Sequence, residues 1–204
     1  MTGDMTSAAT TNRLPSNPFS TRFTRPGMLP PLDQEGVPVD VGRLLAGLHA
    51  GGLAIEGPHG HGKTNLLHAV LAAAVAAGRP TGFFRIGSQD WGWRALFLIG
   101  RARPETVVGI DGWELLSPGL AGLLRVAATC RRATIVATTH GPARMPVLAR
   151  CETSPRLLAA IVDRLPAHGG CIAKTDIDEA FHRHEGNVRE ALYDLYDRFE
   201  RRVR

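Results

Sequence analysis

The feature that most constrains this chain is a glycine-rich turn between an expected apolar strand and an expected helix. The strand is predicted over residues 53–56, and strong helix formers fill residues 64–77 up to Gly78. Glycines allow the backbone to bend where other residues would be strained. A strand–turn–helix unit of this kind predicts a sheet on which the helix packs. The turn has the sequence Gly57-Pro58-His59-Gly60-His61-Gly62-Lys63-Thr64.

The spacing of this turn, G-x-x-x-x-G-K-[ST], predicts a phosphate-binding loop. Successive backbone N–H groups can point at phosphate oxygens, and the N-terminus of the next helix adds a positive dipole. Lys63 is expected to contact the β- and γ-phosphates, and the Thr64 hydroxyl to bind Mg²⁺. Lys63 and Lys174 are the two lysines of an arginine-rich chain, so a lysine at this position is informative. Nucleotide binding is therefore assigned to Gly57, Pro58, His59, Gly60, His61, Gly62, Lys63, Thr64 and Asn65.

The order of the remaining elements predicts an α/β fold with a parallel sheet. Further strands are expected over residues 81–86, 105–110 and 133–139, with helices over 90–103 and from 117 onward between them. After residue 153 the strands cease, and three helices are expected to begin near 154, 175 and 187. The chain thus divides into a flexible arm (1–30), a nucleotide-binding core (31–152) and a helical subdomain (153–204).

Together with later motifs, the turn resembles the P-loop NTPase superfamily and, more narrowly, its compact AAA+ ATPases, over residues 38–200. Val107–Asp111 resembles a Walker B strand, which implies that Asp111 holds Mg²⁺, directly or through water. The fourth strand ends in Thr138-Thr139-His140, where a polar residue resembles sensor 1 of AAA+ proteins or the switch histidine of ABC cassettes, and Thr139 is assigned to this position. Satisfied strand-end polar groups explain the stretch as well. Gly186–Leu192 resembles the lid stretch G-[ND]-x-R-x-x-L, which implies that Arg189 reaches the γ-phosphate. The resemblance implies a three-layer P-loop NTPase core with a parallel sheet, plus a small C-terminal helical lid-like subdomain.

The sequence departs from this resemblance directly after the Walker B aspartate. Hydrolytic relatives usually carry Glu there, whereas this chain has Gly112 and its nearest carboxylate is Glu114. Glu114 is expected either to orient the attacking water or to cap the next helix. The predicted function is Mg²⁺-dependent ATP binding and hydrolysis, with Lys63, Glu114, Thr139 and Arg189 in catalytic roles. The alternatives are a nucleotide-binding switch with little hydrolysis and a small-molecule P-loop kinase.

Charge and composition bear on partners and location. The net charge of +5 permits an acidic partner, and Arg198, Arg201, Arg202 and Arg204 make the C-terminal end basic. DNA, a protein client and a second copy of the chain are the candidate partners, and the segment 17–27 is expected either to pack on the domain or to contact nucleic acid. No apolar run is long enough for a membrane span, and no secretion signal appears at the N-terminus. Three cysteines without C-x-x-C spacing predict reduced thiols in the cytoplasm.

Overall fold

The computed structural model describes residues 17–87 and 92–203 and contains a five-stranded parallel sheet. The strand order is β2-β3-β4-β1-β5. The strands are β1 Gly51–Glu56, β2 Thr81–Arg85, β3 Val107–Asp111, β4 Thr134–Thr139 and β5 Val147–Arg150. The helices are α1 Thr21–Thr24, α2 Val41–Ala46, α3 Lys63–Ala76, α4 Trp93–Gly100, α5 Pro118–Cys130, α6 Pro155–Val162, α7 Lys174–Arg183 and α8 Val188–Val203, with the 3-10 turn η1 at Trp113–Leu115. Within the described part of the chain, no helix has the length and apolar character needed to cross a membrane.

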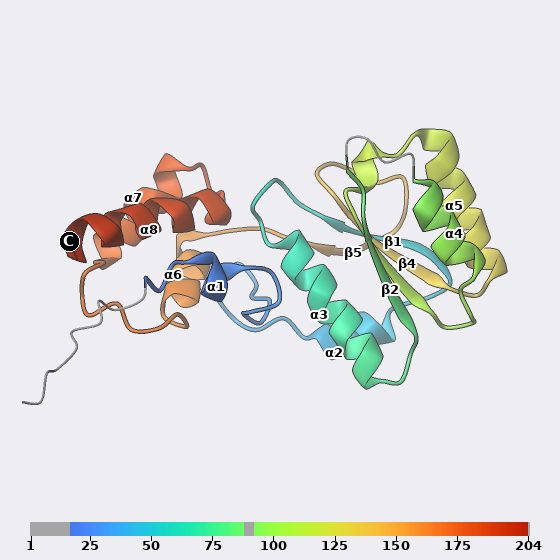
Figure 1. Ribbon diagram of the computed structural model, residues 1–204, viewed down its shortest axis with the longest axis horizontal. Coiled ribbons are helices and arrows are strands. Elements are labelled where there is room, and N and C mark those ends of the chain that lie inside the picture. The colour runs from blue at the N-terminus through green and yellow to red at the C-terminus, as the bar shows by residue number, and fades with distance from the viewer. Residues whose placement is uncertain (1–16, 88–91, 204) are drawn as a thin grey trace, which may run out of the picture.

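The core has three layers, as predicted. Helices α2 and α3 cover one face of the sheet, and α4 and α5 cover the other (Figure 1). The alternation of side chains along β4 serves both faces: Val136 packs with α3, whereas Ile135 and Ala137 pack with α4 and α5. A strand buried on both faces reads as a continuous apolar run, which is why β3 and β4 were predictable.

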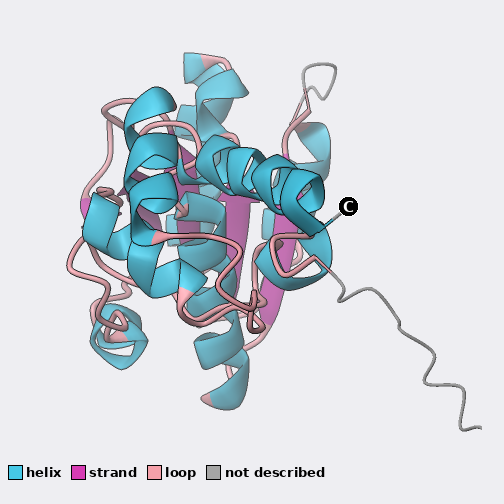
Figure 2. Ribbon diagram, turned by 90° about the vertical axis from the view of Figure 1, so that its left-hand side faces the viewer, coloured by secondary structure: helices cyan, strands magenta, loops and turns pink. Residues whose placement is uncertain are grey.

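The parallel register brings the carboxyl ends of the strands to one edge. Glu56 of β1 pairs with Thr139 of β4, and Arg85 of β2 pairs with Asp111 of β3. Open parallel sheets bind ligands at this edge. Here it faces the phosphate loop and the helical subdomain, which Figure 2 shows in front of the strands.

Three short elements were missed by the sequence prediction, namely the strand β5, the helix α1 and the 3-10 turn η1. Strand β5 is a short edge strand with a half-exposed pattern, so it lacks the apolar run that identified the others. Helix α1 has only four residues and none of them is buried, so no helical period marks it. The helix expected over 90–103 is observed as α4 from Trp93 to Gly100, and its expected residues 90 and 91 lie outside the described part.

The three C-terminal helices have a hydrophobic core of their own. Leu158, Val162 and Leu195 are among its fully buried side chains. Ser154 and Pro155 start α6 as predicted, because the Ser154 hydroxyl accepts from Leu157 N and Pro155 lacks the N–H that would be left unpaired. The three helices, packed around this core, form a lid-like helical subdomain.

The segment before residue 30 contributes to that same core. Phe19 is only 1% exposed and packs against Phe199, with ring centroids 6.3 Å apart. Asn17 donates from its amide to Tyr196 O at 3.1 Å. Of the two placements expected for residues 17–27, the structure therefore shows packing on the domain. The earlier part of the expected flexible arm, residues 1–16, lies outside the described residues.

Candidate functional site

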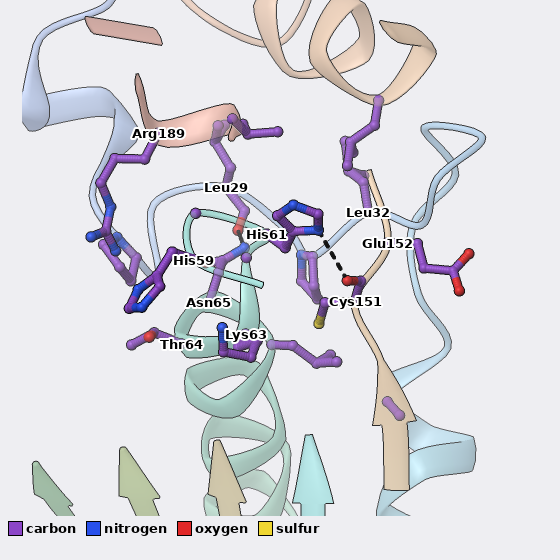
Figure 3. Close-up of a pocket in the computed structure, with 18 of the residues that line it drawn as sticks. Leu29, Leu32, His59, His61, Lys63, Thr64, Asn65, Cys151, Glu152 and Arg189 are labelled. Atoms are coloured by element: carbon purple, nitrogen blue, oxygen red, sulfur yellow. Dashed lines mark hydrogen bonds between the residues drawn. The ribbon is translucent and has the colours of Figure 1, made fainter. Parts of the chain in front are cut away.

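The phosphate loop connects β1 to α3, and its glycines adopt conformations that other residues avoid. Gly60 and Gly62 have φ of +73° and +83°, and Gly62 is the N-cap of α3. The helix therefore begins at Lys63 with its N-terminus directed at the loop. Figure 3 shows the loop residues above α3, with the strand arrowheads pointing toward them. This is the strand–loop–helix arrangement that the sequence predicted.

Lys63 is buried beneath the loop and holds it closed. Its side chain donates from Nζ to the carbonyls of Gly57 and Pro58, both at 2.6 Å, and lies 3.0 Å from Nδ1 of His140. Burial lowers the pKa of Lys63, and nearby Arg189 acts in the same direction. The ammonium group thus sits at the centre of the loop, within a ring of oxygen and nitrogen acceptors.

Asp111 ends β3 and is the meeting point of three side chains. The Thr64 hydroxyl donates to Asp111 Oδ1 at 3.1 Å, and the Thr138 hydroxyl donates to the same oxygen at 2.6 Å. Arg85, at the end of the neighbouring β2, forms an ion pair with Asp111 Oδ2 at 2.9 Å. The structure thus brings together Thr64 and Asp111, the two residues that the sequence analysis expects to bind Mg²⁺. Sequence reasoning missed Arg85, which the pairing of β2 with β3 would have suggested.

Glu114 lies beside His140. Its Oε1 is 3.0 Å from His140 Nε2, and the His140 ring stacks on that of His59 with centroids 3.4 Å apart. Burial lowers the pKa of His140, and the charge of Lys63 lowers it further. A neutral imidazole with Lys63 at Nδ1 must accept there and carry its proton on Nε2, because an ammonium group has only donors. His140 therefore donates to the Glu114 carboxylate.

Thr139 occupies a different position from its neighbours. Its side chain is 4% exposed, and its hydroxyl donates to Gly141 O at 3.1 Å. Consecutive strand residues point to opposite faces, so Thr138 rather than Thr139 reaches Asp111. His140 lies just beyond the strand and lines the cavity at the loop. The sequence prediction had selected Thr139 from this stretch, and the structure places its neighbours on either side against the other site residues.

The lid-like subdomain contacts the phosphate loop at the start of α8. A methyl group on Gly60 would overlap the side chain of Asn187, so this side chain lies directly against the Gly60 backbone. The Asn187 side chain also accepts from Glu190 N at 3.2 Å, which starts the helix. Arg189 is the second residue of α8 and lines the same cavity as His59 and Lys63 (Figure 3).

The side chains of Asn65 and His61 form hydrogen bonds with other parts of the chain. Asn65 accepts from Gly27 N at 2.7 Å and donates to Leu29 O at 3.1 Å, so it fastens the segment after α1 to α3. His61 Nδ1 lies 3.3 Å from Cys151 O, and burial lowers the pKa of this histidine. Burial also raises the pKa of the Cys151 thiol to about 11.

These parts enclose a cavity of about 1310 Å³ between the core and the lid-like subdomain. The cavity is polar at the phosphate loop and at the ends of β2 and β3. Farther from the loop it is lined by apolar side chains from the segment before β1 and from the lid, among them Leu29, Leu32, Ile161 and Leu192. One end can therefore receive a phosphate chain and the other an apolar ring.

Comparisons with known proteins agree with this fold. No protein-family profile matches the sequence, and no curated protein matches it. Two solved structures of RuvB variants from Thermotoga maritima superpose on the chain with TM-scores of 0.56 and 0.55, at 16% and 17% sequence identity. Each match covers 79% of this chain and 60% of the RuvB chain, so this chain matches about three fifths of the length of RuvB.

The geometry and the comparisons together define the class of the fold. RuvB is an AAA+ P-loop ATPase. The chain described here has the same kind of α/β core, with a parallel sheet and a phosphate loop between its first core strand and the next helix. It is an AAA+-like P-loop fold, as the sequence motifs indicated. At this level of identity the likeness shows the fold alone.

Proposed function

We propose that this protein binds ATP with Mg²⁺ in the cavity and hydrolyses it. The observation that carries the proposal is the meeting of Thr64 and Asp111 directly beside the buried Lys63. A phosphate loop supplies the lysine and the backbone N–H groups for the phosphate chain, and the hydroxyl–carboxylate pair supplies the ligands for a cation beside it. No other group of side chains in the described residues combines these features.

The residues present fit Mg²⁺. This ion prefers hard oxygen ligands and is usually bound through one or two protein groups plus phosphate oxygens. Thr64 and Asp111 offer such oxygens 3.1 Å apart, and Thr138 orients the carboxylate by donating to it at 2.6 Å. When bound there, Mg²⁺ would neutralise charge on the β- and γ-phosphates.

Positively charged side chains and backbone N–H groups of the protein would stabilise the remaining negative charge on the γ-phosphate. Lys63 and the N–H groups at the start of α3 lie on the core side, and Arg189 approaches from the lid. Charge stabilisation of this kind supplies most of the catalysis in phosphoryl transfer. Arg189 therefore makes catalysis depend on how the lid sits on the core.

The pair Glu114–His140 would orient the attacking water. In the reaction, water oxygen bonds to the γ-phosphorus, the bond to the bridging oxygen breaks, and ADP leaves with that electron pair. The proton released by the water would pass to the Glu114 carboxylate, which His140 holds in place across 3.0 Å. Thr139 would act as a positioning residue, because its hydroxyl fixes the Gly141 turn that follows His140. Glu114 would thereby supply the carboxylate that hydrolytic relatives usually carry directly after the Walker B aspartate, where this chain has Gly112.

The proposal also covers the choice of nucleotide, the partners and the location of the protein. The choice of ATP over GTP rests on the resemblance to AAA+ proteins. A homo-oligomer, a protein client or a nucleic-acid partner and a cytoplasmic location are further parts of the proposal. All three cysteines are free thiols, which suits a reducing compartment.

The test is a comparison of Lys63→Ala with Lys174→Ala. Lys174 is the other lysine of the chain and is exposed at the start of α7, so it is a matched control. Binding of a fluorescent ATP analogue and phosphate release from Mg·ATP are measured over a range of protein concentrations. We expect Lys63→Ala to lose both and Lys174→Ala to retain both, with release rising with concentration if subunits cooperate.

The other results separate the alternatives. Unchanged ATP affinity in Lys63→Ala would overturn the site assignment. Tight binding by the wild-type protein without phosphate release at any concentration would support the switch. Phosphate transfer that appears only when a small-molecule acceptor is added would support the kinase.

A further inference from the structure

A cluster of arginines lies at the edge of the sheet opposite the phosphate loop. Strands β2, β3 and β4 begin level with one another, because Thr81 pairs with Val107 and Val107 pairs with Thr134. The residues just before these strands therefore meet at one edge. We call the group formed there the basic edge, and it consists of Arg79, Arg101, Arg103, Arg131 and Arg132.

Hydrogen bonds join these residues into one surface. Arg79 Nε donates to Glu105 O at 3.0 Å, and Glu105 N donates to Arg132 O at 2.8 Å. The Arg131 guanidinium donates to Gly100 O at the end of α4, directly before Arg101. The basic edge is thus a continuous patch across the starts of the strands and the ends of α4 and α5, which lie side by side away from the lid (Figure 1).

The charges of the basic edge are not neutralised by carboxylates. In the described structure, none of its five arginines forms an ion pair, and four of them are exposed. The C-terminal arginines behave differently. Arg198 pairs with Asp176 at 2.9 Å, and Arg202 pairs with the same carboxylate at 2.6 Å. Those two guanidinium groups, which the sequence had marked as candidates for nucleic acid, stabilise the lid instead.

Exposed aromatic rings extend from the basic edge along α4. Trp93 and Phe97 are 63% and 64% exposed, although large aromatic side chains usually bury much of their surface. Trp93 and Phe97 are four residues apart on α4, and Arg101 follows four residues after Phe97. The Arg101 guanidinium lies 4.9 Å from the centre of the Phe97 ring. The three side chains therefore follow one side of the helix. Positive charge and exposed aromatic rings thus lie on one continuous surface.

We propose that the basic edge and the exposed side of α4 bind single-stranded nucleic acid. Unpaired arginines attract the phosphate backbone, and aromatic rings accept unpaired bases by stacking, which is how sequence-independent binding to single strands works. The bases of a duplex are stacked inside it, so a duplex offers no unpaired base that could stack on Trp93 or Phe97. An acidic peptide would neutralise the arginines but would leave the two rings without planar partners. Both features together favour a single strand.

This site specifies the nucleic-acid partner of the proposed function, and it does not depend on ATP binding or hydrolysis. The basic edge is at the amino ends of the strands, whereas Asp111 and Thr139 are at their carboxyl ends. The test is therefore made without nucleotide. Fluorescence anisotropy of a 5′-labelled 30-nucleotide oligo(dT) is titrated with the full chain between 50 and 200 mM NaCl, and a 30-base-pair duplex is titrated in parallel.

Two double variants test the two halves of the surface. Arg101→Ala/Arg103→Ala is expected to weaken oligo(dT) binding about tenfold and to lower the slope of log affinity against log salt by roughly 1.4, since each phosphate contact contributes about 0.7. Trp93→Ala/Phe97→Ala is expected to weaken oligo(dT) binding about tenfold through lost stacking, with the salt slope unchanged. The wild-type protein should prefer oligo(dT) to the duplex.

The matched control is Arg22→Ala/Arg201→Ala, which removes the same charge from the arm and the lid. Both residues are exposed, and the Arg22 guanidinium lies over the Phe23 ring at 5.5 Å, much as Arg101 lies over Phe97. This control should retain wild-type affinity, and thermal unfolding checks that all variants are folded. No binding by the wild-type protein at 50 mM NaCl, an equal loss in the control, or equal affinity for the duplex would overturn the proposal. So would a loss of self-association in the surface variants with oligo(dT) affinity unchanged.

Discussion

The imidazole of His140 lies 3.0 Å from the carboxylate of Glu114 and, on its other side, 3.0 Å from the ammonium group of Lys63. The phosphate-loop lysine is therefore linked through a neutral ring to the nearest carboxylate after Asp111. Hydrogen bonds in such a chain polarise one another. The pair also gives Glu114 a fixed position, although the intervening Gly112 has φ of +90° and separates it from β3.

Removing either member of this pair should slow hydrolysis and leave ATP binding intact. A positioned proton acceptor contributes about 10²–10⁴-fold to a rate, so Glu114→Gln and His140→Ala should each lower kcat by about 100-fold. The double variant should be no slower than the worse single variant, because the two residues act as a unit. Single-turnover phosphate release and ATP titration on all three variants give these numbers. Additive losses in the double variant would show that the two residues act separately.

Hydrolysis should also fall in mildly acidic solution because of His140. Its pKa is lowered from 6.5 by burial, Lys63 and His59, while Glu114 and Asp111 act in the opposite direction. The ring is therefore neutral at pH 7 and becomes protonated only below pH 6.5, where Nδ1 changes from an acceptor to a donor facing the Lys63 ammonium. The profile of kcat against pH should show this acidic limb. His140→Gln should be slower throughout and should lack that limb, whereas an identical limb in this variant would assign it to another group.

The sequence predicted those site residues that belong to a motif with a fixed spacing along the chain. The phosphate loop specified Lys63 and Thr64, and an apolar strand ending in Asp111 specified the partner of Thr64. It could not decide between Thr138 and Thr139, because one residue of uncertainty in where a strand ends reverses which side chain faces the site. His140 follows the strand, so its position depends on a turn that has no strong sequence signal.

Contacts between segments that are far apart in the chain could also not be predicted from the sequence. Phe19 looked like part of a loose arm because nothing nearby has a helical period, yet it fills a place beside Phe199 in the lid core. Arg198 looked like part of a solvated basic end, and its partner Asp176 lies 22 residues earlier on another helix. In both cases the decisive neighbour is separated by a chain reversal that local patterns do not specify.

The approach of the lid to the phosphate loop can be measured by comparing two glycines. Both Gly60 and Gly62 have positive φ, but a methyl group on Gly60 would overlap Asn187, whereas one on Gly62 would meet nothing within 4 Å. Gly62→Ala should therefore lose about 1 kcal/mol from backbone strain alone. Gly60→Ala should lose the same amount plus the cost of moving the Asn187 side chain away from its hydrogen bond with Glu190 N, as measured by urea unfolding.

A rescue variant separates the two costs in Gly60→Ala. Asn187→Gly removes the overlapping side chain, and glycine at an N-cap costs only a few tenths of a kcal/mol. Adding it to Gly60→Ala should bring the free energy of unfolding back toward that of Gly62→Ala. If Asn187→Gly stabilises the Gly60→Ala protein no more than it stabilises the wild type, the lid does not rest on Gly60.

The ion-pair network of Arg198 should determine how stable the lid is. Arg198 is 8% exposed and lies 2.9 Å from Asp176, 2.9 Å from Glu179 and 3.1 Å from Asp194. Removing Arg198 takes one partner from each carboxylate, although Asp176 keeps Arg202 and Asp194 keeps Arg183, so Arg198→Met should lower the free energy of unfolding by about 2 kcal/mol. Arg201→Met, at an exposed position on the same helix, should change it by less than about 0.5 kcal/mol. Urea unfolding at pH 7 compares the two, and equal losses would mean that the helix loses packing rather than charge balance.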